Sequence, residues 1–253
     1  MTRIHEPALT RSGIYRLLAT AFLYPDPKAG GVAHLRDASG RLAREASRTG
    51  LARTVRALRR TRNTLSHRVG GTLLDDYIEV FGHGVSGDCP SYEGEYDQAD
   101  VFQKSQMLAD LNACYHAFGV VPSPEIKERP DHVSVELDFM HLLTLKEGYA
   151  LLQGHGAEKV RICRDAQESF LAVHLSPWIL EFAGRVARKA SKTNAYRALT
   201  RLLTVHMETE LAMFRLEPPG GRPGAVSDSG TDEHLGAAVS ADHAAMEASC
   251  DAA

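Results

Sequence analysis

The chain has 253 residues, of which 43% are hydrophobic and 24% are charged, and its formal net charge at pH 7 is −3. A chain of this length can bury a large core, which excludes a disulfide-stabilised miniprotein and an intrinsically disordered polymer. The longest apolar stretch near the start covers residues 17–24, far short of the ~20 residues that a membrane-spanning helix needs. We therefore expect no stable insertion into a membrane.

The start of the chain and its cysteines predict a cytoplasmic protein. Polar and charged residues interrupt the first 16 positions and no small-residue cleavage site follows the apolar stretch, so a secretory signal peptide is not expected. The cysteines at positions 89, 114, 163 and 250 lie far apart and form no CxxC pair. This spacing favours neither a zinc site nor a disulfide framework, and a reducing compartment fits it best.

Charge is segregated along the chain. Residues 1–70 contain 14 basic and 4 acidic side chains, whereas residues 71–147 contain 4 basic and 15 acidic ones. Residues 148–216 are again basic, with 10 against 6, and residues 217–253 contain 1 basic and 7 acidic side chains. The near-neutral total therefore conceals an acidic block that is suited to a cationic partner.

The hydrophobic pattern predicts an all-α fold, because apolar residues recur with the helical period and runs of β-branched residues are almost absent. The first helix carries Leu9, Ile14 and Leu18 on one face and ends before the Pro25-Asp26-Pro27 turn. Two arginine-rich helices follow at about 32–49 and 51–68, and a short amphipathic helix at 73–81. The remaining helices are expected at about 99–118, 131–153, 156–174, 177–191 and 194–215.

These elements are expected to form a single helical-bundle domain over residues 1–216, a length that one hydrophobic core supports. From residue 217 the composition changes: five glycines, three prolines and one basic residue occur, and no aromatic residue. Such a segment buries too little apolar surface to offset the entropy of ordering it. We expect residues 217–253 to be a disordered acidic tail.

The segment FGHGVSGDCPSYEGEY at residues 81–96 links two predicted helices. Its glycines lack the GxxxxGK[ST] pattern of a phosphate-binding loop, and its acidic residues would repel phosphate. One interpretation is a plain glycine-rich link. The other is a peptide-docking platform, because Pro90, Tyr92 and Tyr96 present rigid apolar surface at low entropic cost.

The segment ERPDHVSVELDFMH at residues 128–141 starts the long predicted helix. His132, Glu136 and His141 share its first turns, so a helical metal-binding protein or metalloenzyme is one hypothesis, although the spacing is not HExxH. The simpler interpretation is that Asp131 caps the helix and that His132 and Glu136 form an ion pair. We expect Asp131 and His132 to lie at an exposed first turn, where they can meet a cation.

Two further features have competing interpretations. The stretch Arg41 to Arg68 can bind nucleic acid through phosphate charge, but no aromatic residue interleaves it to stack bases, so a solvated helix face is the simpler interpretation. His206 and Glu210 are spaced as a surface ion pair. No motif of hydrolytic catalysis occurs, and we expect neither enzymatic activity nor a cofactor.

Three motifs together resemble the TorD/DmsD/NarJ group of redox-enzyme maturation chaperones. YRLLATAFLYPDP at residues 15–27 is similar to that family's first helix and its Tyr-Pro-Asp turn. DYIEVF at 76–81 followed by PSYEGEY at 90–96, and then ERPDH at 128–132 leading into VELDFM, are similar to the family's two later motifs. The resemblance covers about residues 9–216, and it departs from the pattern at Val80, where leucine is usual, and at Gly94, where serine is common.

The resemblance implies an all-helical cytoplasmic chaperone without catalytic activity. Its partner would be the apo-form of a molybdopterin enzyme catalytic subunit of the dimethyl sulfoxide reductase superfamily, bound through its twin-arginine signal peptide so that export waits for cofactor insertion. The long ERPDHVSVELDFM block favours a dehydrogenase or a chlorate or selenate reductase as client. Nucleic acid is not an implied partner.

The resemblance and the acidic charge together indicate which residues contact the client. We expect Asp131, assisted by Glu93, Glu95 or Glu128, to pair with the client arginines, and aromatic residues to take the apolar segment. The complete set of expected signal-peptide contacts is Tyr77, Val80, Phe81, Pro90, Tyr92, Glu93, Asp131 and His132.

Overall fold

The computed structural model describes residues 4–26, 31–67, 72–82, 87–96, 101–121 and 128–217, and within these ranges the regular structure is helical. The all-α prediction is confirmed. The predicted tail lies outside the described residues, except for Glu217. The helices are α1 (Glu6–Phe22), α2 (Gly31–Ala46), α3 (Ala52–Ser66), α4 (Leu73–Phe81), α5 (Val101–Ala117), α6 (Val133–Gln153), α7 (Ala157–Phe170), α8 (Ser176–Lys189) and α9 (Ala195–Phe214).

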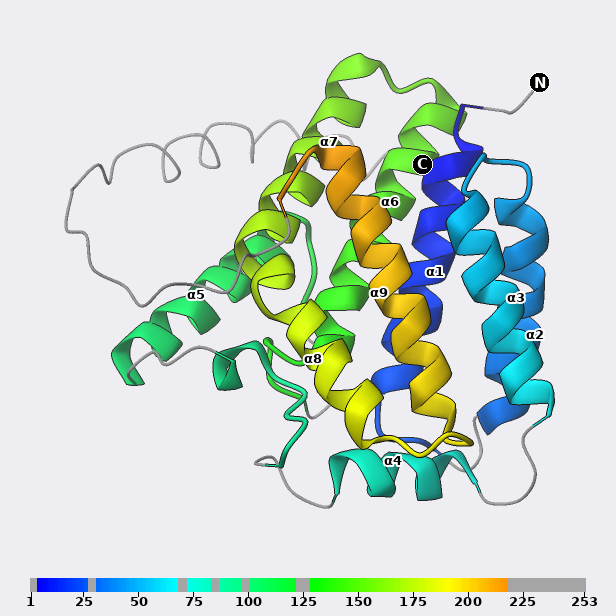
Figure 1. Ribbon diagram of the computed structural model, residues 1–253. Coiled ribbons are helices and arrows are strands. Elements are labelled where there is room, and N and C mark those ends of the chain that lie inside the picture. The colour runs from blue at the N-terminus through cyan, green and yellow to red at the C-terminus, as the bar shows by residue number, and fades with distance from the viewer. Residues whose placement is uncertain are drawn as a thin grey trace.

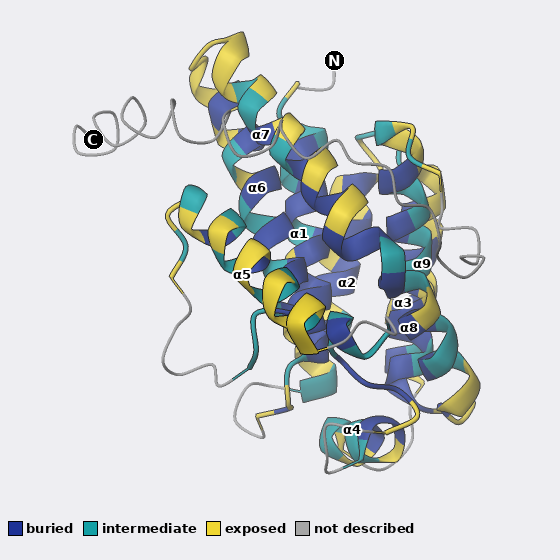
Figure 2. Ribbon diagram, turned by 90° about the vertical axis from the view of Figure 1, so that its left-hand side faces the viewer, coloured by how far each residue is buried: buried dark blue, intermediate teal, exposed yellow. Residues whose placement is uncertain are grey.

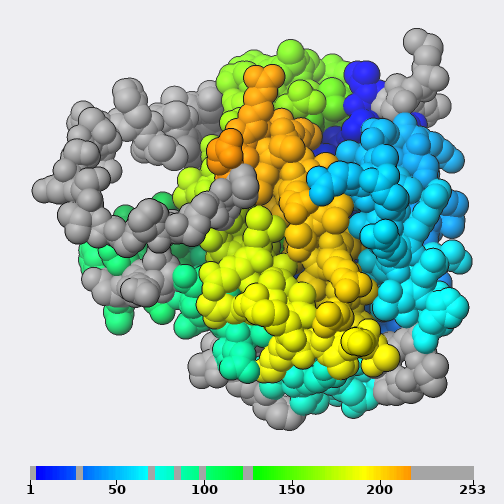
Figure 3. Space-filling view, in the orientation of Figure 1, coloured from blue at the N-terminus to red at the C-terminus, as the bar shows by residue number. Residues whose placement is uncertain are grey.

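The bundle is organised around α1, which packs along α6 and also contacts α2 and α9. In Figure 1, α2 and α3 lie on one side of this centre, α7 and α8 on the other, and α4 lies across one end. The space-filling view shows α3, α9 and α8 adjoining on one face (Figure 3). None of the helices in the described ranges combines the length and apolar character of a bilayer span.

Local sequence explains where several of these helices begin and stop. Thr72 and Asp75 form a reciprocal capping box at the start of α4, which satisfies two backbone amides that would otherwise lack partners. Asn194 caps α9 by accepting a hydrogen bond from the Tyr196 amide. At the end of α6, Gly154 adopts a left-handed conformation (φ 67°), which glycine enters without steric cost.

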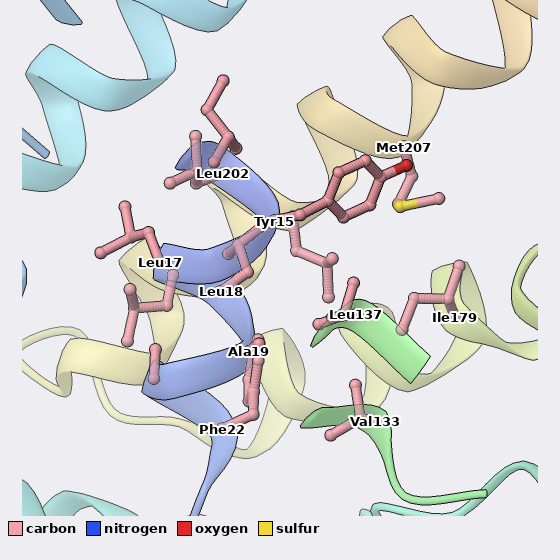
Figure 4. Packing of buried hydrophobic residues seen from close by; sticks show 14 of the residues in the cluster. Tyr15, Leu17, Leu18, Ala19, Phe22, Val133, Leu137, Ile179, Leu202 and Met207 are labelled. Carbon is pink, nitrogen blue, oxygen red and sulfur yellow. The ribbon is translucent and has the colours of Figure 1, made fainter. Parts of the chain in front are cut away.

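The core is formed by large apolar side chains that are completely buried. Figure 4 shows Tyr15, Leu18 and Phe22 of α1 beside Leu137 of α6 and Leu202 of α9. The buried face of each helix turns inward in Figure 2, whereas α5 remains largely exposed and buries only two residues, Leu111 and Tyr115. Gly148 permits the close approach of α6 to α1, because a Cβ atom there would lie 2.5 Å from Leu9 Cδ2.

A buried ion-pair network ties α1 to three other helices. Arg11 Nε and Nη2 donate to the two carboxylate oxygens of Glu210 at 2.7 and 2.6 Å, Nη1 donates to Glu147 at 3.1 Å, and Nη2 also donates to Gln167 at 2.6 Å. All four side chains are buried. The expected surface ion pair of His206 with Glu210 is therefore wrong: both are buried, and Glu210 pairs with Arg11, a residue of the first helix.

The predicted break between residues 174 and 177 is also wrong. Residues Leu171–Leu175 form a π-helical turn that carries the chain from α7 into α8 without a loop. Pro177 follows at the first turn of α8, where the amide hydrogen that proline lacks is not needed by the helix. The π turn buries His174 on the side that faces the loop at 87–96.

Candidate functional site

Two of the three motifs come together beside the start of α6. Tyr92 and His132 form an isolated antiparallel bridge, in which the Glu93 amide donates to the Asp131 carbonyl at 2.9 Å and the Val133 amide donates to the Ser91 carbonyl at 2.8 Å. Residues 90–96 and 128–132 therefore lie side by side, although α5 separates them in the sequence. Their grouping into one site is consistent with the motif resemblance.

An aromatic surface adjoins this bridge. The Tyr77 ring contacts Tyr24 edge to face at 5.3 Å and Phe81 at 4.6 Å between centroids. Tyr24 is 55% exposed and Tyr77 is partly exposed, whereas Phe81 and Val80 are buried beneath them. Of these three rings, a partner can thus reach those of Tyr24 and Tyr77, whereas the Phe81 ring is buried.

Glu128 lies at the edge of the aromatic surface. Its Oε2 accepts a hydrogen bond from the Tyr92 hydroxyl at 2.7 Å and lies 3.9 Å from His132 Nε2. Burial, followed by the negative charge of Glu128, raises the pKa of Tyr77 to about 12, so the two side chains are electrostatic neighbours. The Glu128 side chain is 24% exposed. Glu128 therefore offers a partly accessible carboxylate at the Tyr92 hydroxyl, and its charge acts on Tyr77.

His132 does not neutralise this carboxylate. It is almost completely buried, and burial lowers its pKa to about 4 despite the nearby acidic charges. Its Nδ1 accepts a hydrogen bond from the Ser134 amide at 3.2 Å, which makes His132 the N-cap of α6. The neutral ring consequently carries its proton on Nε2, toward Glu128. In the described part of the chain, Glu128 has no lysine or arginine partner within ion-pair distance.

Asp131 is buried and already bound, so its expected position at an exposed first turn is wrong. Arg129 Nε and Nη2 donate to the two Asp131 carboxylate oxygens at 2.9 and 2.6 Å, and the Gly94 amide donates to Oδ2 at 3.2 Å. The prediction that Asp131 caps α6 is also wrong, because His132 has that role. At Gly94, an added Cβ would lie 3.3 Å from Asp131 Oδ2, so glycine leaves room for this tight cluster.

Glu93 turns inward instead of toward solvent. Its Oε2 lies 3.5 Å from Nδ1 of His174, which belongs to the π turn. Although burial opposes a charged imidazole, Cys114 and Glu93 together raise the pKa of His174 to about 9. Pro90 is buried as well, and its carbonyl accepts a hydrogen bond from the Tyr96 hydroxyl at 2.8 Å. Glu93 and Pro90 therefore support the conformation of the loop at 87–96 through contacts inside the protein.

The expected ion pair of His132 with Glu136 does not form. The fully buried Glu136 accepts a hydrogen bond from the indole of Trp178 at 3.2 Å, and burial raises its pKa well above the ordinary value. His141 contacts Ser12 of α1 at 2.8 Å. His132, Glu136 and His141 therefore serve three different contacts, and the described residues contain no group of three or more potential ligands that could hold a metal ion.

The arginine-rich helices show the pattern of solvated faces. The described arginines between positions 41 and 62 are exposed, while alanine and leucine side chains between them are buried. Arg53 pairs with Glu208 of α9 at 2.6 Å. Arg68 lies outside the described residues. Nothing in this arrangement adds aromatic stacking groups to the charge, which is what single-stranded nucleic acid would require.

Sequence reasoning missed two residues of this surface. Tyr24 was noted only as part of a turn, although the proline after it ends α1 and leaves its ring exposed beside Tyr77. Arg129 received no role, yet its guanidinium carbon lies 4.7 Å from the centre of the Tyr92 ring, and its Nε and Nη2 donate to Asp131. The spacing of Arg129 and Asp131, two residues apart before a helix, was the available signal for this pair.

The chain is similar to one family model and to several known proteins. The family model described as nitrate reductase delta subunit matches residues 44–184, more than half of the chain. The selenate reductase assembly chaperone of Thauera selenatis is 33% identical over 137 residues, which are 53% of this chain and 68% of that protein. The chlorate reductase assembly chaperone of Ideonella dechloratans is 32% identical over 116 residues, covering 46% of this chain and 58% of that protein.

A third relative matches over a greater length. The perchlorate reductase assembly chaperone of Dechloromonas aromatica is 26% identical over 223 residues, which are 81% of this chain and 92% of that protein. These relatives are named as chaperones and not as catalysts, in agreement with the expectation that this chain is not an enzyme. The chain therefore belongs to the nitrate reductase delta subunit family and is a redox-enzyme maturation protein of the TorD/NarJ type.

Proposed function

We propose that this chaperone binds the twin-arginine signal peptide and apo-form of a molybdenum-containing oxidoreductase catalytic subunit in the cytoplasm, and delays export until the cofactor has been inserted. No covalent chemistry is needed for this role. Holding the client in the bound state acts by mass action, because whatever binds only one state of a protein increases the population of that state.

The observation that carries the proposal is the partly exposed carboxylate of Glu128. It accepts a hydrogen bond from Tyr92 and acts electrostatically on Tyr77, whose ring contacts the exposed Tyr24. A twin-arginine signal consists of a cationic pair and a moderately apolar segment. A partly desolvated carboxylate binds a guanidinium through strong charge-assisted hydrogen bonds, and aromatic rings accept both apolar side chains and cations. The surface therefore offers complementary chemistry to both halves of such a segment within one small area.

The eight residues expected from the resemblance and the acidic charge divide into two groups under this proposal. Tyr77 and Tyr92 contact the client directly. The other six act indirectly, since five are buried and Glu93 is only slightly exposed: they hold the aromatic rings, the loop and the first turn of α6 in place. This supporting group consists of Val80, Phe81, Pro90, Glu93, Asp131 and His132.

The relatives indicate the class of client. They are named for the assembly of selenate, chlorate and perchlorate reductases. We propose that the client here is also an oxyanion reductase, which agrees with the preference drawn from the ERPDHVSVELDFM block. Purification of the tagged chaperone from its own cells, with identification of a precursor that retains an uncleaved twin-arginine signal, tests the client class.

The binding site is tested by calorimetry with a synthetic peptide in which two adjacent arginines precede an apolar segment. Replacing Glu128→Gln removes the charge but keeps the size, and we expect it to weaken binding by about tenfold, as loss of one charge-assisted hydrogen bond would do. Glu158→Gln is the matched control. Glu158 is exposed and lies beyond the far end of α6, which rises about 30 Å.

Two results would refute the proposal. One is equal affinity for the twin-arginine peptide and for a scrambled peptide of the same composition. The other is equal affinity of the Glu128→Gln variant and the unmodified chain, which would move the arginine contact away from Glu128. A twin-lysine peptide provides a further comparison, because lysine keeps the charge and lacks the planar fork that pairs with a carboxylate.

A further inference from the structure

Arg129 occupies a site with all the features of a guanidinium receptor. Asp131 binds its Nε and Nη2 through two parallel hydrogen bonds at 2.9 and 2.6 Å. The Tyr92 ring lies under the guanidinium at 4.7 Å, and Glu95 Oε1 lies 3.5 Å from Nη1. A bidentate carboxylate, an aromatic face and a second carboxylate are the groups that proteins use to recognise arginine.

The two halves of this site differ in their accessibility. The Asp131 side chain is completely buried, and it is held from the other side by the Gly94 amide. The Arg129 side chain is 39% exposed and belongs to the non-helical segment before α6. The receptor half is therefore built into the protein, while the guanidinium half can rotate into solvent without disturbing a helix.

Tyr92 connects this site to Glu128. Its hydroxyl donates to Glu128, and its ring face carries the Arg129 guanidinium. Tyr92 thus contacts both Glu128, which has no lysine or arginine partner among the described residues, and the arginine that is paired with Asp131. This arrangement matches a ligand with two adjacent arginines, one for each carboxylate.

We propose that Arg129 is an internal ligand of a guanidinium site formed by Asp131, Tyr92 and Glu95, and that the second arginine of the client binds by displacing it. This inference rests on the function proposed above for the first arginine at Glu128. Displacement exchanges one arginine–carboxylate pair for another, so the second client arginine adds little net affinity while Arg129 competes with it. By occupying Asp131, Arg129 thereby prevents weak cationic ligands from binding there in the free chaperone.

The site itself is tested by chemical complementation in the full chain. Arg129→Ala leaves the receptor half empty, and we expect N-acetyl-arginine amide at 10 mM to raise its melting temperature by about 3–5 °C. N-acetyl-lysine amide is expected to raise it by less than about 1 °C, because an ammonium cannot pair with Asp131 in two places. The unmodified chain and an Arg129→Ala/Asp131→Asn variant keep only the Glu128 contact available and are expected to respond by less than about 1 °C.

Controls separate this effect from general stabilisation. Arg161 is exposed and pairs with Asp165, so Arg161→Ala removes an arginine of similar kind and is expected to show no response to N-acetyl-arginine amide. If Arg129→Ala does not fold, Arg129→Lys preserves the charge without the fork and is expected to respond in the same way, with a smaller shift. An equal response of the Arg129 and Arg161 variants would overturn the proposal.

Displacement is tested by peptide binding. The Arg129→Ala variant lacks the internal competitor, and we expect its affinity for the twin-arginine peptide to be about tenfold higher than that of the unmodified chain. Unchanged or weaker binding would show that Arg129 is only a structural partner of Asp131, while peptide binding by the unmodified chain would leave the function at Glu128 standing. Conversely, complementation without any peptide binding would support the guanidinium site and refute displacement by a signal peptide.

Discussion

Arg11 is the residue whose replacement tests the packing of the bundle most directly. Arg11→Met keeps the length of the side chain but removes four hydrogen bonds to Glu210, Glu147 and Gln167. Glu147 retains Arg164 at 2.7 Å, so the group left without its cation is Glu210. Removing one partner of a buried ion pair costs about 3–5 kcal/mol, a large share of the ~5–15 kcal/mol that stabilises a typical domain.

The measurement is urea-induced unfolding followed by circular dichroism at pH 7, with Arg16→Met as the control. Arg16 lies on the same helix and pairs with Asp138, but both side chains are substantially exposed, so the expected loss is at most about 1 kcal/mol. The double variant Arg11→Met/Glu210→Met is expected to recover most of the loss, because an apolar pair leaves no buried charge. If Arg11→Met and Arg16→Met lowered the free energy of unfolding equally, the inference that burial makes the Arg11 ion pairs important for stability would be refuted.

Two further predictions concern pH and close packing. The folded-state pKa values of His132 and His206 are about 4 because both are buried, so the stability they contribute is present above the ordinary value of 6.5 and is lost as the pH falls toward 4. The pKa of His174 is about 9, so its contribution is present below 6.5 and is lost as the pH rises through 9. Unfolding measured from pH 4 to 10 should show a maximum near neutrality, and His132→Asn, which retains a capping side chain, should reduce the acid slope; a flat profile between pH 6.5 and 4 would contradict this. Gly148→Val should lower stability by about 1–3 kcal/mol in thermal melts because it forces α1 from α6, whereas Gly184→Ala should be neutral or stabilising, since only the flexible end of a surface arginine lies nearby.

The helices were predictable from the sequence because their signals are local. The period of the apolar residues, the proline turn after α1 and the glycine after α6 lie within a few residues of the features they determine. The join between α7 and α8 was not predictable in this way. A π turn preserves the helical pattern almost unchanged, and Pro177 has the same local appearance whether it starts a separate helix or follows such a turn.

The sequence was sufficient to predict which segments form the candidate site. It was not sufficient to predict which of their side chains are exposed to solvent. The start of a helix is normally open to water, which is why Asp131 and His132 were expected at the surface. The bridge to residues 91–93 covers them, and its register depends on two segments that α5 separates. Glu210 shows the same limit, since its partner Arg11 is 199 positions away. Burial of a polar residue by a distant segment leaves no mark on the neighbouring sequence.

The bridge between Tyr92 and His132 has a consequence for how this family can diversify. It joins the two ends of the chain segment that contains α5, so this segment starts and ends at the same place in the structure. When the ends of a segment are held together, the entropic cost of lengthening it grows slowly, by about 0.6 kcal/mol for each doubling of its length. The segment that contains α5 can therefore change in length at little entropic cost, while the Tyr92–His132 bridge holds residues 91–93 against the start of α6 beside Glu128.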